Sequence, residues 1–357
     1  MIFGINNNDC YVSVMFSIQG KERMVLKLKS FARKVKRRLI QTSIISPRPT
    51  SLNVFTTNRC TFSCFYCGRN IKDDAPGVDN RYEDKSDFHF ADLRFLLDKY
   101  PSIRRVSFVG VGEPFLVQDL LSMARLAKEK GKYVVVVTNG SVLHQFWGRI
   151  APSFDQVSVS LHGLTATELT AISKVSEHVF NQFVDNVRYL VQKEKNLNPS
   201  IDVRASVVML KTNLDRVKRA AIFCAENSVP ELDVQNYIPI GLDNYENCVF
   251  NNDFEYIRFI DKLIQEFHGS LKINPPVLIK RNDRALSWGC TTFFNTLRVD
   301  GLGQVSGCSR IMVPMAKNGN YRNEPDVWQN VYYREMRQRF RAKRNLPDCC
   351  RFCPEAQ

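Results

Sequence analysis

The alternation of strand-like and helix-like segments constrains the fold of this chain more than any other feature. The strand candidates are short, and the run Tyr133–Val137 is continuous, as in a strand buried on both faces. The strand candidates lie at 52–57, 104–109, 132–138, 156–161, 201–209 and 232–238. Helical patterns lie between them at 90–99, 117–130, 177–194 and 214–227. Repeated β-α units predict a parallel sheet with right-handed crossovers. Six units predict an α/β fold, a partial (β/α)6 TIM-like barrel that is open on one side.

A loop with three cysteines follows the first strand candidate. Cys60, Cys64 and Cys67 have C-x3-C-x2-C spacing. In a parallel β/α barrel the chemistry gathers at the carboxyl ends of the strands, where this loop lies. Three thiolates in one short loop suit an iron–sulfur cluster, and a cubane would keep one iron open. A zinc site and three unrelated buried cysteines are the alternatives.

Further turns with glycine or polar residues follow the later strands. After the second strand, Gly110 and Gly112 would let a ligand approach the backbone, and Glu113 could accept hydrogen bonds from an ammonium group. On the fifth strand, Arg204 could hold a carboxylate, or it could form a structural ion pair. His162 is either a ligand contact or a hydrogen-bonded structural histidine. The turns are Val109–Pro114, Thr138–Gly140, Ser160–Gly163 and Pro239–Gly241.

Together, the cysteine loop and these turns resemble the radical S-adenosylmethionine superfamily over roughly residues 50–245. The resemblance implies a 4Fe–4S cluster on Cys60, Cys64 and Cys67, with S-adenosylmethionine on its open iron. Cleavage of that molecule would give a 5′-deoxyadenosyl radical, which abstracts a hydrogen atom from the substrate. Val111 stands where the family commonly has glycine, so we expect a small change in loop shape. The implied S-adenosylmethionine contacts are Tyr66, Gly112, Glu113, Asn139, Ser160 and Arg204.

Five cysteines lie near the C-terminus. Segment 296–305 predicts a hairpin with Asp-Gly at its turn, and a helical pattern at 326–344 precedes a C-x2-C motif. The region resembles the Twitch domain, a truncated relative of the SPASM domain. This resemblance implies a second, auxiliary 4Fe–4S cluster. Zinc is the alternative metal, and Cys349 is the rival of Cys350 as a ligand. The implied ligands are Cys290, Cys308, Cys350 and Cys353.

Charge and composition bear on partners and location. The net charge is +14, and its excess lies mainly in segments 21–38 and 334–351, which favours anionic partners. Segment 21–40 predicts a basic amphipathic helix that packs on the main domain, lies on an anionic membrane surface or contacts nucleic acid. The sequence shows no secretory signal and no apolar run of about 18 residues. We therefore expect a cytoplasmic protein, with peripheral contact at the inner membrane surface as an alternative.

These features predict four regions. They are an N-terminal extension (1–49), the partial barrel (50–245), a connecting helix at 253–267 with a linker (246–285), and a small α+β auxiliary-cluster domain (286–357).

The function expected from this architecture is oxidation or epimerisation of a small sugar-, nucleotide- or lipid-like molecule. An auxiliary cluster with four cysteine ligands would carry an electron, and flavodoxin or ferredoxin would supply the first one. Cys248, after the sixth strand, could return a hydrogen atom to a substrate radical. Peptide maturation is one alternative, although about 50 N-terminal residues are few for a leader-binding domain. A zinc-stapled basic module that binds RNA or membrane without catalysis is an alternative of another class.

Overall fold

A computed structural model gives the fold. It describes residues 48–64, 67, 86–110, 112–237, 245–279, 290–308, 315–347, 350 and 353. The predicted basic helix at 21–40, Tyr66, the turn at 239–241 and Cys349 lie outside the described residues.

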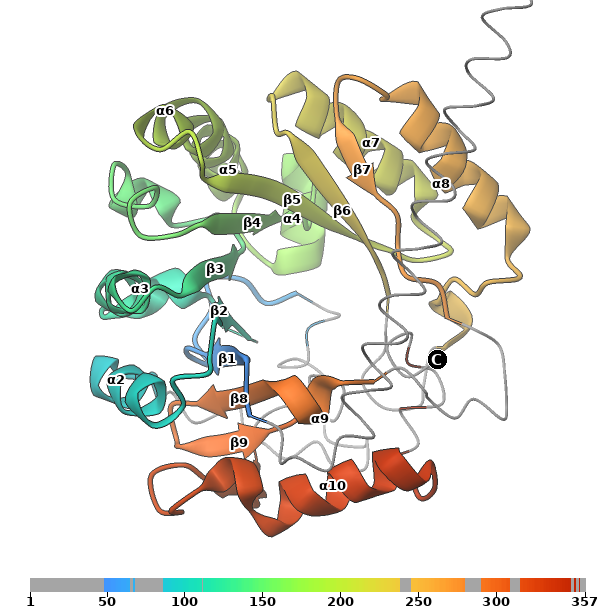
Figure 1. Ribbon diagram of the computed structural model, residues 1–357. Helices are drawn as coiled ribbons and strands as arrows, with labels where there is room; N and C mark the ends of the chain where they lie inside the picture. Colours follow the sequence, from blue (N-terminus) through green and yellow to red (C-terminus); the bar gives the residue numbers. More distant parts are fainter. Residues whose placement is uncertain are drawn as a thin grey trace, which may run out of the picture.

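One ten-stranded sheet organises the described residues (Figure 1). Its order is β10-β9-β8-β1-β2-β3-β4-β5-β6-β7, which leaves β7 and β10 at the two edges. All neighbours from β8 through β1 to β7 are parallel, whereas β9 pairs antiparallel with β8 and β10. The predicted α/β barrel with consecutive parallel strands is confirmed. The strands are β1 Ser51–Phe55, β2 Arg105–Val109, β3 Tyr133–Thr138, β4 Gln156–Ser160, β5 Asp202–Met209, β6 Glu231–Asn236, β7 Lys272–Asn274, β8 Thr296–Asp300, β9 Gln304–Ser306 and β10 Met315–Asn320.

Helices α2, α3, α5, α7 and α8 lie along the outer side of the curved sheet (Figure 1). The predicted helix at 177–194 consists of α5 and a π-helical turn, Leu190–Glu194. The pattern at 326–344 is interrupted because Asn330 caps α10 by accepting a hydrogen bond from the Tyr333 amide (3.0 Å). Within the described residues no helix is long and apolar enough to cross a membrane. The helices are α2 Phe90–Lys99, α3 Leu120–Glu129, α4 Ala166–Ser173, α5 Glu177–Tyr189, α6 Lys195–Leu197, α7 Leu214–Glu226, α8 Phe254–Glu266, α9 Thr292–Asn295 and α10 Val331–Ala342.

The two faces of the sheet differ in chemistry. Residues such as Leu52 and Phe108 are fully buried in the core formed with the helices. Alternate positions along the same strands carry polar side chains, including Asn53 on β1 and Arg105 on β2. Because side chains alternate across a strand, the apolar half of β1 and β2 packs against the helices, and the other half, which is largely polar, faces the barrel interior. The interior therefore offers polar groups to a ligand.

The C-terminal hairpin continues the sheet of the barrel. β8 lies beside β1 in parallel register, with Leu52 opposite Leu297. The Thr50 amide donates to the Asn295 carbonyl (2.8 Å), which starts this pairing one residue before β1. At the hairpin turn, Asp300 Oδ1 accepts hydrogen bonds from the amides of Leu302 and Gln304 (3.0 and 2.9 Å). The predicted hairpin is confirmed. Its strand β8 lies in the same sheet as β1, the strand that precedes the cysteine loop.

Candidate functional site

A cavity of about 160 Å³ lies at the carboxyl ends of β1 to β4. The predicted cysteine loop and the turns after the second, third and fourth strands all contribute to it. Parallel strands end at one rim of a barrel, which explains why turns far apart in the sequence meet here. The lining residues are Cys60, Phe62, Cys64, Cys67, Gly110, Gly112, Glu113, Val137, Thr138, Asn139, Ser160 and His162.

Polar groups surround the thiols of the loop. Cys60 Sγ accepts hydrogen bonds from the Phe62 amide (3.4 Å) and Asn139 Nδ2 (3.5 Å). Cys64 Sγ lies 3.3 Å from Ser173 Oγ. Burial raises the pKa of the Cys64 thiol to about 11, and the charges of Cys67 and Cys60 act in the same direction. Three neighbouring thiols of this kind fit a bound cationic centre, which displaces their protons.

The thiols are not arranged around a single point. Among the described residues no three His, Cys, Asp or Glu side chains are close enough to share one metal ion. This arrangement is compatible with a cluster, since each thiolate of a cubane binds a different iron.

Gly112 lets two loops touch. A Cβ at this position would lie 2.1 Å from the Thr57 carbonyl oxygen and 2.6 Å from that of Arg59. The next amide, of Glu113, donates to the same Arg59 carbonyl (2.8 Å). Gly112 therefore admits the backbone of the cysteine loop. It also lines the cavity, and its contact with a ligand stays a prediction. The turn after β2 thus packs directly against the backbone of this loop.

The carboxylate of Glu113 connects β2 to β3. Oε1 accepts hydrogen bonds from the Phe115 amide (3.2 Å) and Thr138 Oγ1 (2.7 Å), and Oε2 accepts one from the Asn139 amide (2.7 Å). Burial raises the pKa of Glu113 to about 7, and these hydrogen bonds oppose the rise. Three neutral donors hold the carboxylate at the cavity wall. Its contact with an ammonium group stays a prediction.

Asn139, Ser160 and His162 complete the rim. Asn139 also donates to Thr61 Oγ1 (3.0 Å), so one amide binds two residues of the cysteine loop. His162 lies edge-on to the ring of Phe62, with the ring centroids 5.8 Å apart. Burial lowers the pKa of His162 to about 4, and Arg216 lowers it further. The imidazole is therefore neutral at physiological pH and acts as a nonionic part of the wall.

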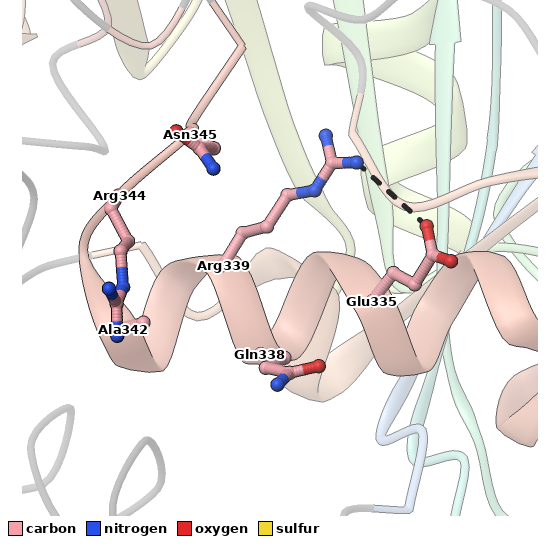
Figure 2. A pocket seen from close by; sticks show the side chains of 6 residues that line it. All are labelled: Glu335, Gln338, Arg339, Ala342, Arg344 and Asn345. Carbon is pink, nitrogen blue, oxygen red and sulfur yellow. Dashed lines mark ion pairs between the residues drawn. The ribbon is translucent and has the colours of Figure 1, made fainter.

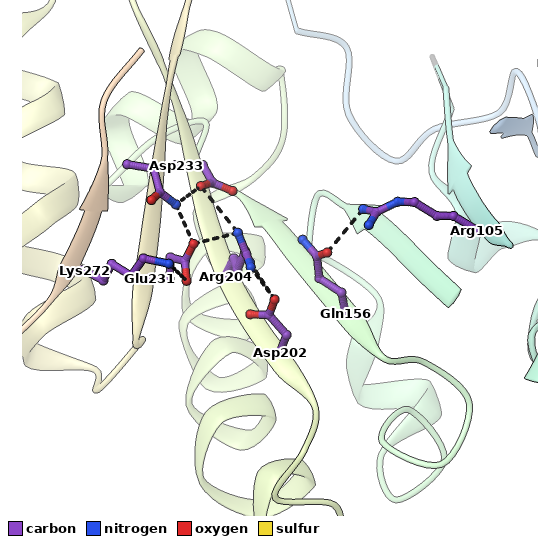
Figure 3. Close-up of polar contacts among 8 residues, drawn as sticks. Arg105, Gln156, Asp202, Arg204, Glu231, Asp233 and Lys272 are labelled. Carbon is purple, nitrogen blue, oxygen red and sulfur yellow. Dashed lines mark hydrogen bonds and ion pairs between the residues drawn. The ribbon is translucent and has the colours of Figure 1, made fainter. Parts of the chain in front are cut away.

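Arg204 does not line the cavity. Its guanidinium forms ion pairs with Asp202 (2.5 Å), Glu231 (2.6 Å) and Asp233 (3.9 Å), and Lys272 also contacts Glu231 (2.9 Å; Figure 3). These residues lie toward the amino ends of β5 to β7, away from the cysteine loop. Arg204 therefore forms structural ion pairs, which was one of the two interpretations of this residue. Its contact with S-adenosylmethionine stays a prediction.

Strand register shows why Arg204 does not line the cavity. Arg204 is level with Ser158 on β4, whereas Ser160 is level with Ser206 on β5. The Leu161 amide donates to the Ser206 carbonyl (2.7 Å), so Ser206 is the β5 residue level with the end of β4. No local pattern in the sequence reveals this register, so sequence reasoning could not place Arg204 along the barrel.

The C-terminal cysteines belong to, or pack against, the buried core. Cys290, Cys350 and Cys353 are buried, and Cys308 packs against the same core. Burial raises the pKa of the Cys290 thiol to about 11, and the charges of Cys308 and Cys353 raise it further. Within the described residues the thiols of Cys290, Cys308 and Cys353 are therefore neighbours in space. Their set of donors fits an iron–sulfur cluster.

Cys248 lies elsewhere. It is fully buried against Phe250 and Ile279 and is not among the residues that line the cavity. Its role as a hydrogen donor stays a prediction.

A second hollow, of about 400 Å³, lies on the exposed side of α10 (Figure 2). Arg339 reaches toward Glu335 there, with 3.8 Å between Nη2 and Oε2. No cysteine is among the described residues that line this hollow, so the cavity at the cysteine loop is the candidate active site. The lining residues are Glu335, Gln338, Arg339, Ala342, Arg344 and Asn345.

The Radical SAM superfamily model matches residues 54–224, which contain the cysteine loop and the rim of the cavity. The chain belongs to this superfamily. Its members use S-adenosylmethionine and a 4Fe–4S cluster, as the resemblance implied.

Curated relatives of this radical SAM chain differ in their named activities. A "Probable GTP 3′,8-cyclase" of Sulfurisphaera tokodaii is 29% identical over 227 residues, covering 62% of this chain and 66% of that protein. The chain thus spans about two thirds of that relative. A "Tungsten-containing aldehyde ferredoxin oxidoreductase cofactor-modifying protein" of Pyrococcus furiosus is 23% identical and covers 83% of this chain and 85% of its own length.

Among solved structures, SuiB of Streptococcus suis bound to its precursor peptide SuiA has the same fold. Its TM-score is 0.60 at 16% identity, and the match covers 100% of this chain and 77% of that one.

Proposed function

We propose that this chain is a two-cluster radical SAM enzyme that oxidises or epimerises a small anionic molecule. One observation carries the proposal: Cys60, Cys64 and Cys67 share a cavity with the turns after β2, β3 and β4. In this proposal the three cysteines hold the first cluster. When bound, the cluster supplies the electron that cleaves S-adenosylmethionine to methionine and a 5′-deoxyadenosyl radical.

The protein's own groups position and shield this chemistry. The Phe62 amide and Asn139 donate to Cys60 and fix its thiolate. Phe62, Leu169 and Ile172 pack around the cysteines as an apolar cluster and exclude water from the reacting centre. Ser160 and the rim of β2 and β3 hold S-adenosylmethionine, which leaves the polar barrel interior for the substrate.

The auxiliary cluster is part of the proposal. Cys290, Cys308, Cys350 and Cys353 hold it, and its four protein ligands leave it the role of carrying an electron. The burial of Cys290, Cys350 and Cys353, and the proximity of Cys290 to Cys308 and Cys353, support this assignment. Because β8 pairs with β1, the hairpin before Cys308 and the first cysteine loop extend from neighbouring strands.

A nucleotide-like substrate is the preferred class. The net charge of +14 favours an anionic ligand, and the Sulfurisphaera relative is named for an activity on GTP. Peptide maturation is an outcome that the experiments below would detect. A non-catalytic zinc module does not fit membership of the superfamily.

Iron content and turnover test the proposal. Anaerobically reconstituted protein should hold about eight irons per chain and release 5′-deoxyadenosine on reduction. Cys64→Ala should abolish that release. The matched control is Cys224→Ala, which removes a fully buried thiol from α7. Release of 5′-deoxyadenosine by Cys64→Ala at the parent rate would contradict the assignment.

A second pair of variants tests the S-adenosylmethionine contacts. Ser160→Ala should weaken binding roughly two- to tenfold, the effect of one hydrogen bond. Arg204→Met should leave the affinity unchanged but lower stability, because it leaves three carboxylates without their common cation. Equal loss of affinity in both variants would restore Arg204 as a ligand contact.

Mass spectrometry can identify the substrate class. Extracts of cells with the active protein and with Cys64→Ala are compared. A nucleotide-like product two hydrogens lighter than its precursor indicates oxidation, and an unchanged mass with altered retention indicates epimerisation. A modified peptide with no small-molecule change would overturn the preferred class.

A further inference from the structure

β8 carries a buried arginine near the auxiliary cysteines. Arg298 is 8% exposed. Its Nη1 donates to the Gly307 carbonyl (2.8 Å), while Nε has no hydrogen-bond partner within the described residues. A buried cation is costly unless an anion and hydrogen-bond acceptors compensate it. Arg298 thus requires a negative group that the hydrogen bond to Gly307 does not provide.

Thiols and phenols are the neighbours that could compensate this charge. Burial lowers the pKa of Arg298, and the groups that oppose this effect are Cys308, Tyr333, Cys290 and Tyr332. None of these is a carboxylate. Two are proposed ligands of the auxiliary cluster, which are negative once they bind iron.

The register of the hairpin explains this proximity. Arg298 on β8 is paired with Ser306 on β9. Ser306 lies two residues before Cys308, and its hydroxyl donates to the Cys308 carbonyl (2.9 Å). The guanidinium therefore lies at the end of the hairpin from which Cys308 extends.

A second buried donor points to the same place. The Tyr332 hydroxyl, from α10, lies beside Gly307 and Ser306 and close enough to Cys308 to be affected by its charge. It is buried, and the Gly307 amide and the Ser306 hydroxyl act as donors toward its oxygen. Within the described residues its own O–H meets no acceptor at hydrogen-bond geometry. Buried donors are nearly always satisfied, so two such atoms beside one cysteine indicate a common acceptor.

We propose that Arg298, assisted by the Tyr332 hydroxyl, provides the counter-charge and hydrogen-bond donors of the auxiliary cluster and raises its reduction potential. The inference rests on the proposed function, because it requires that cluster. A reduced cluster is more negative than an oxidised one, so a buried cation stabilises the reduced form. A higher potential favours acceptance of an electron from the substrate radical, and hence oxidation over epimerisation.

Redox titration of the auxiliary cluster tests the role of Arg298. The full-length chain with Cys60, Cys64 and Cys67 all changed to Ala serves as parent, and it should hold about four irons. Arg298→Met should lower the midpoint potential so that the equilibrium constant for one-electron reduction falls at least tenfold, about 59 mV. Arg298→Lys keeps the charge and should lose less than half of that. Tyr332→Phe should give a smaller decrease.

Arg337→Met is the matched control. Arg337 is also a buried arginine of this region, but it donates to Phe293 O (2.8 Å), Trp328 O (2.8 Å) and Gln329 Oε1 (3.1 Å). The charged groups that affect its pKa are Tyr333, Arg341 and Asp326, and include no cysteine. Its loss should reduce stability and leave the potential unchanged.

The failures are distinguishable. A parent without iron would overturn the auxiliary cluster, and with it the role of Arg298. Four irons in Arg298→Met with the parent potential would overturn the role of Arg298 alone. If Arg298→Met holds no iron, Arg298→Gln replaces it, because Gln retains N–H donors without the charge. A midpoint potential of Arg298→Gln equal to that of the parent would overturn the proposal.

Discussion

Gly112 lies where the turn after β2 passes the cysteine loop. The carbonyl oxygens of Thr57 and Arg59 occupy the space that any side chain at this position would need. The packed atoms are backbone and not the flexible end of a side chain, so they cannot move without moving the loop. The absence of a side chain at Gly112 thus allows the cysteine loop, and with it Cys60, to lie at this position.

Gly112→Ala should therefore displace the loop and lower iron content from about eight toward four per chain. The control is Gly148→Ala, where a Cβ would meet nothing within 4 Å. Because Gly148 has a φ of +76°, this substitution should cost about 1 kcal/mol of stability and leave the iron content unchanged. Iron analysis after anaerobic reconstitution measures the difference. Full iron content in Gly112→Ala would show that the loop can adapt.

Glu113 should make stability depend on pH. Its folded pKa of about 7 exceeds the ordinary value of 4.5, so the folded chain holds its proton where the unfolded chain has lost it. Stability therefore falls as pH rises from about 4.5 to about 7, by on the order of 3 kcal/mol in total. Above pH 7 this contribution is constant.

Urea unfolding of iron-free protein at pH 5 and pH 8 measures this effect. The free energy of unfolding of the parent should be lower at pH 8 than at pH 5. Gln does not titrate, so this decrease should be smaller in Glu113→Gln. An identical pH dependence in both proteins would refute the raised pKa.

Residue-level prediction worked where position follows from topology. Asn139 directly follows β3, Glu113 lies in the turn after β2, and Ser160 ends β4. Parallel strands bring such residues to one rim, and all three line the cavity. Residue-level prediction did not place Arg204, because the position of a side chain along a barrel depends on strand register. The carboxylates that bind Arg204 lie partly on β6, and no local pattern reveals them.

At the scale of elements, hydrophobic periodicity located the six strands and their helices closely. The Asp-Gly turn in segment 296–305 identified the hairpin of β8 and β9. Its parallel pairing with β1 was not predicted, since a strand's pattern shows which face is buried and not which neighbour it meets. α4 was also missed, as was the π-helical turn after α5, which interrupts a continuous helical pattern.

This pairing should make β1 and β8 one cooperative unit. Leu297 is fully buried, and Leu297→Ala should cost about 2–5 kcal/mol. Hydrogen exchange should then accelerate in 51–55 as well as in 296–300, because opening β8 exposes an edge of β1. Ile273→Ala on β7, at the far edge of the sheet, should leave 51–55 unaffected. Faster exchange of β8 alone would contradict the shared unit.

For the whole molecule, the positive charge should govern how an electron donor approaches. In the described part, Arg334, Arg339, Arg341 and Arg344 are exposed along or just after α10, and two of them appear in Figure 2. Opposite charges accelerate encounter, and salt screens them, with a Debye length of about 10 Å at 0.1 M.

Cluster reduction by an acidic flavodoxin should therefore slow roughly tenfold or more between low and high salt. Stopped-flow absorbance measures the rate. The control is a small uncharged reductant, whose rate should not change. A flat salt dependence with flavodoxin would show that the positive surface does not guide the donor.

The place of β8 beside β1 also has a consequence for biosynthesis. Thr50 and Asn295 are hydrogen-bonded although 245 residues separate them. At about 5–20 residues per second, a ribosome needs roughly 12–50 s to make that stretch. During this time β1 has an open edge that can pair with other chains. The nascent protein is thus most exposed to aggregation after its first cysteine loop has emerged and before β8 has emerged.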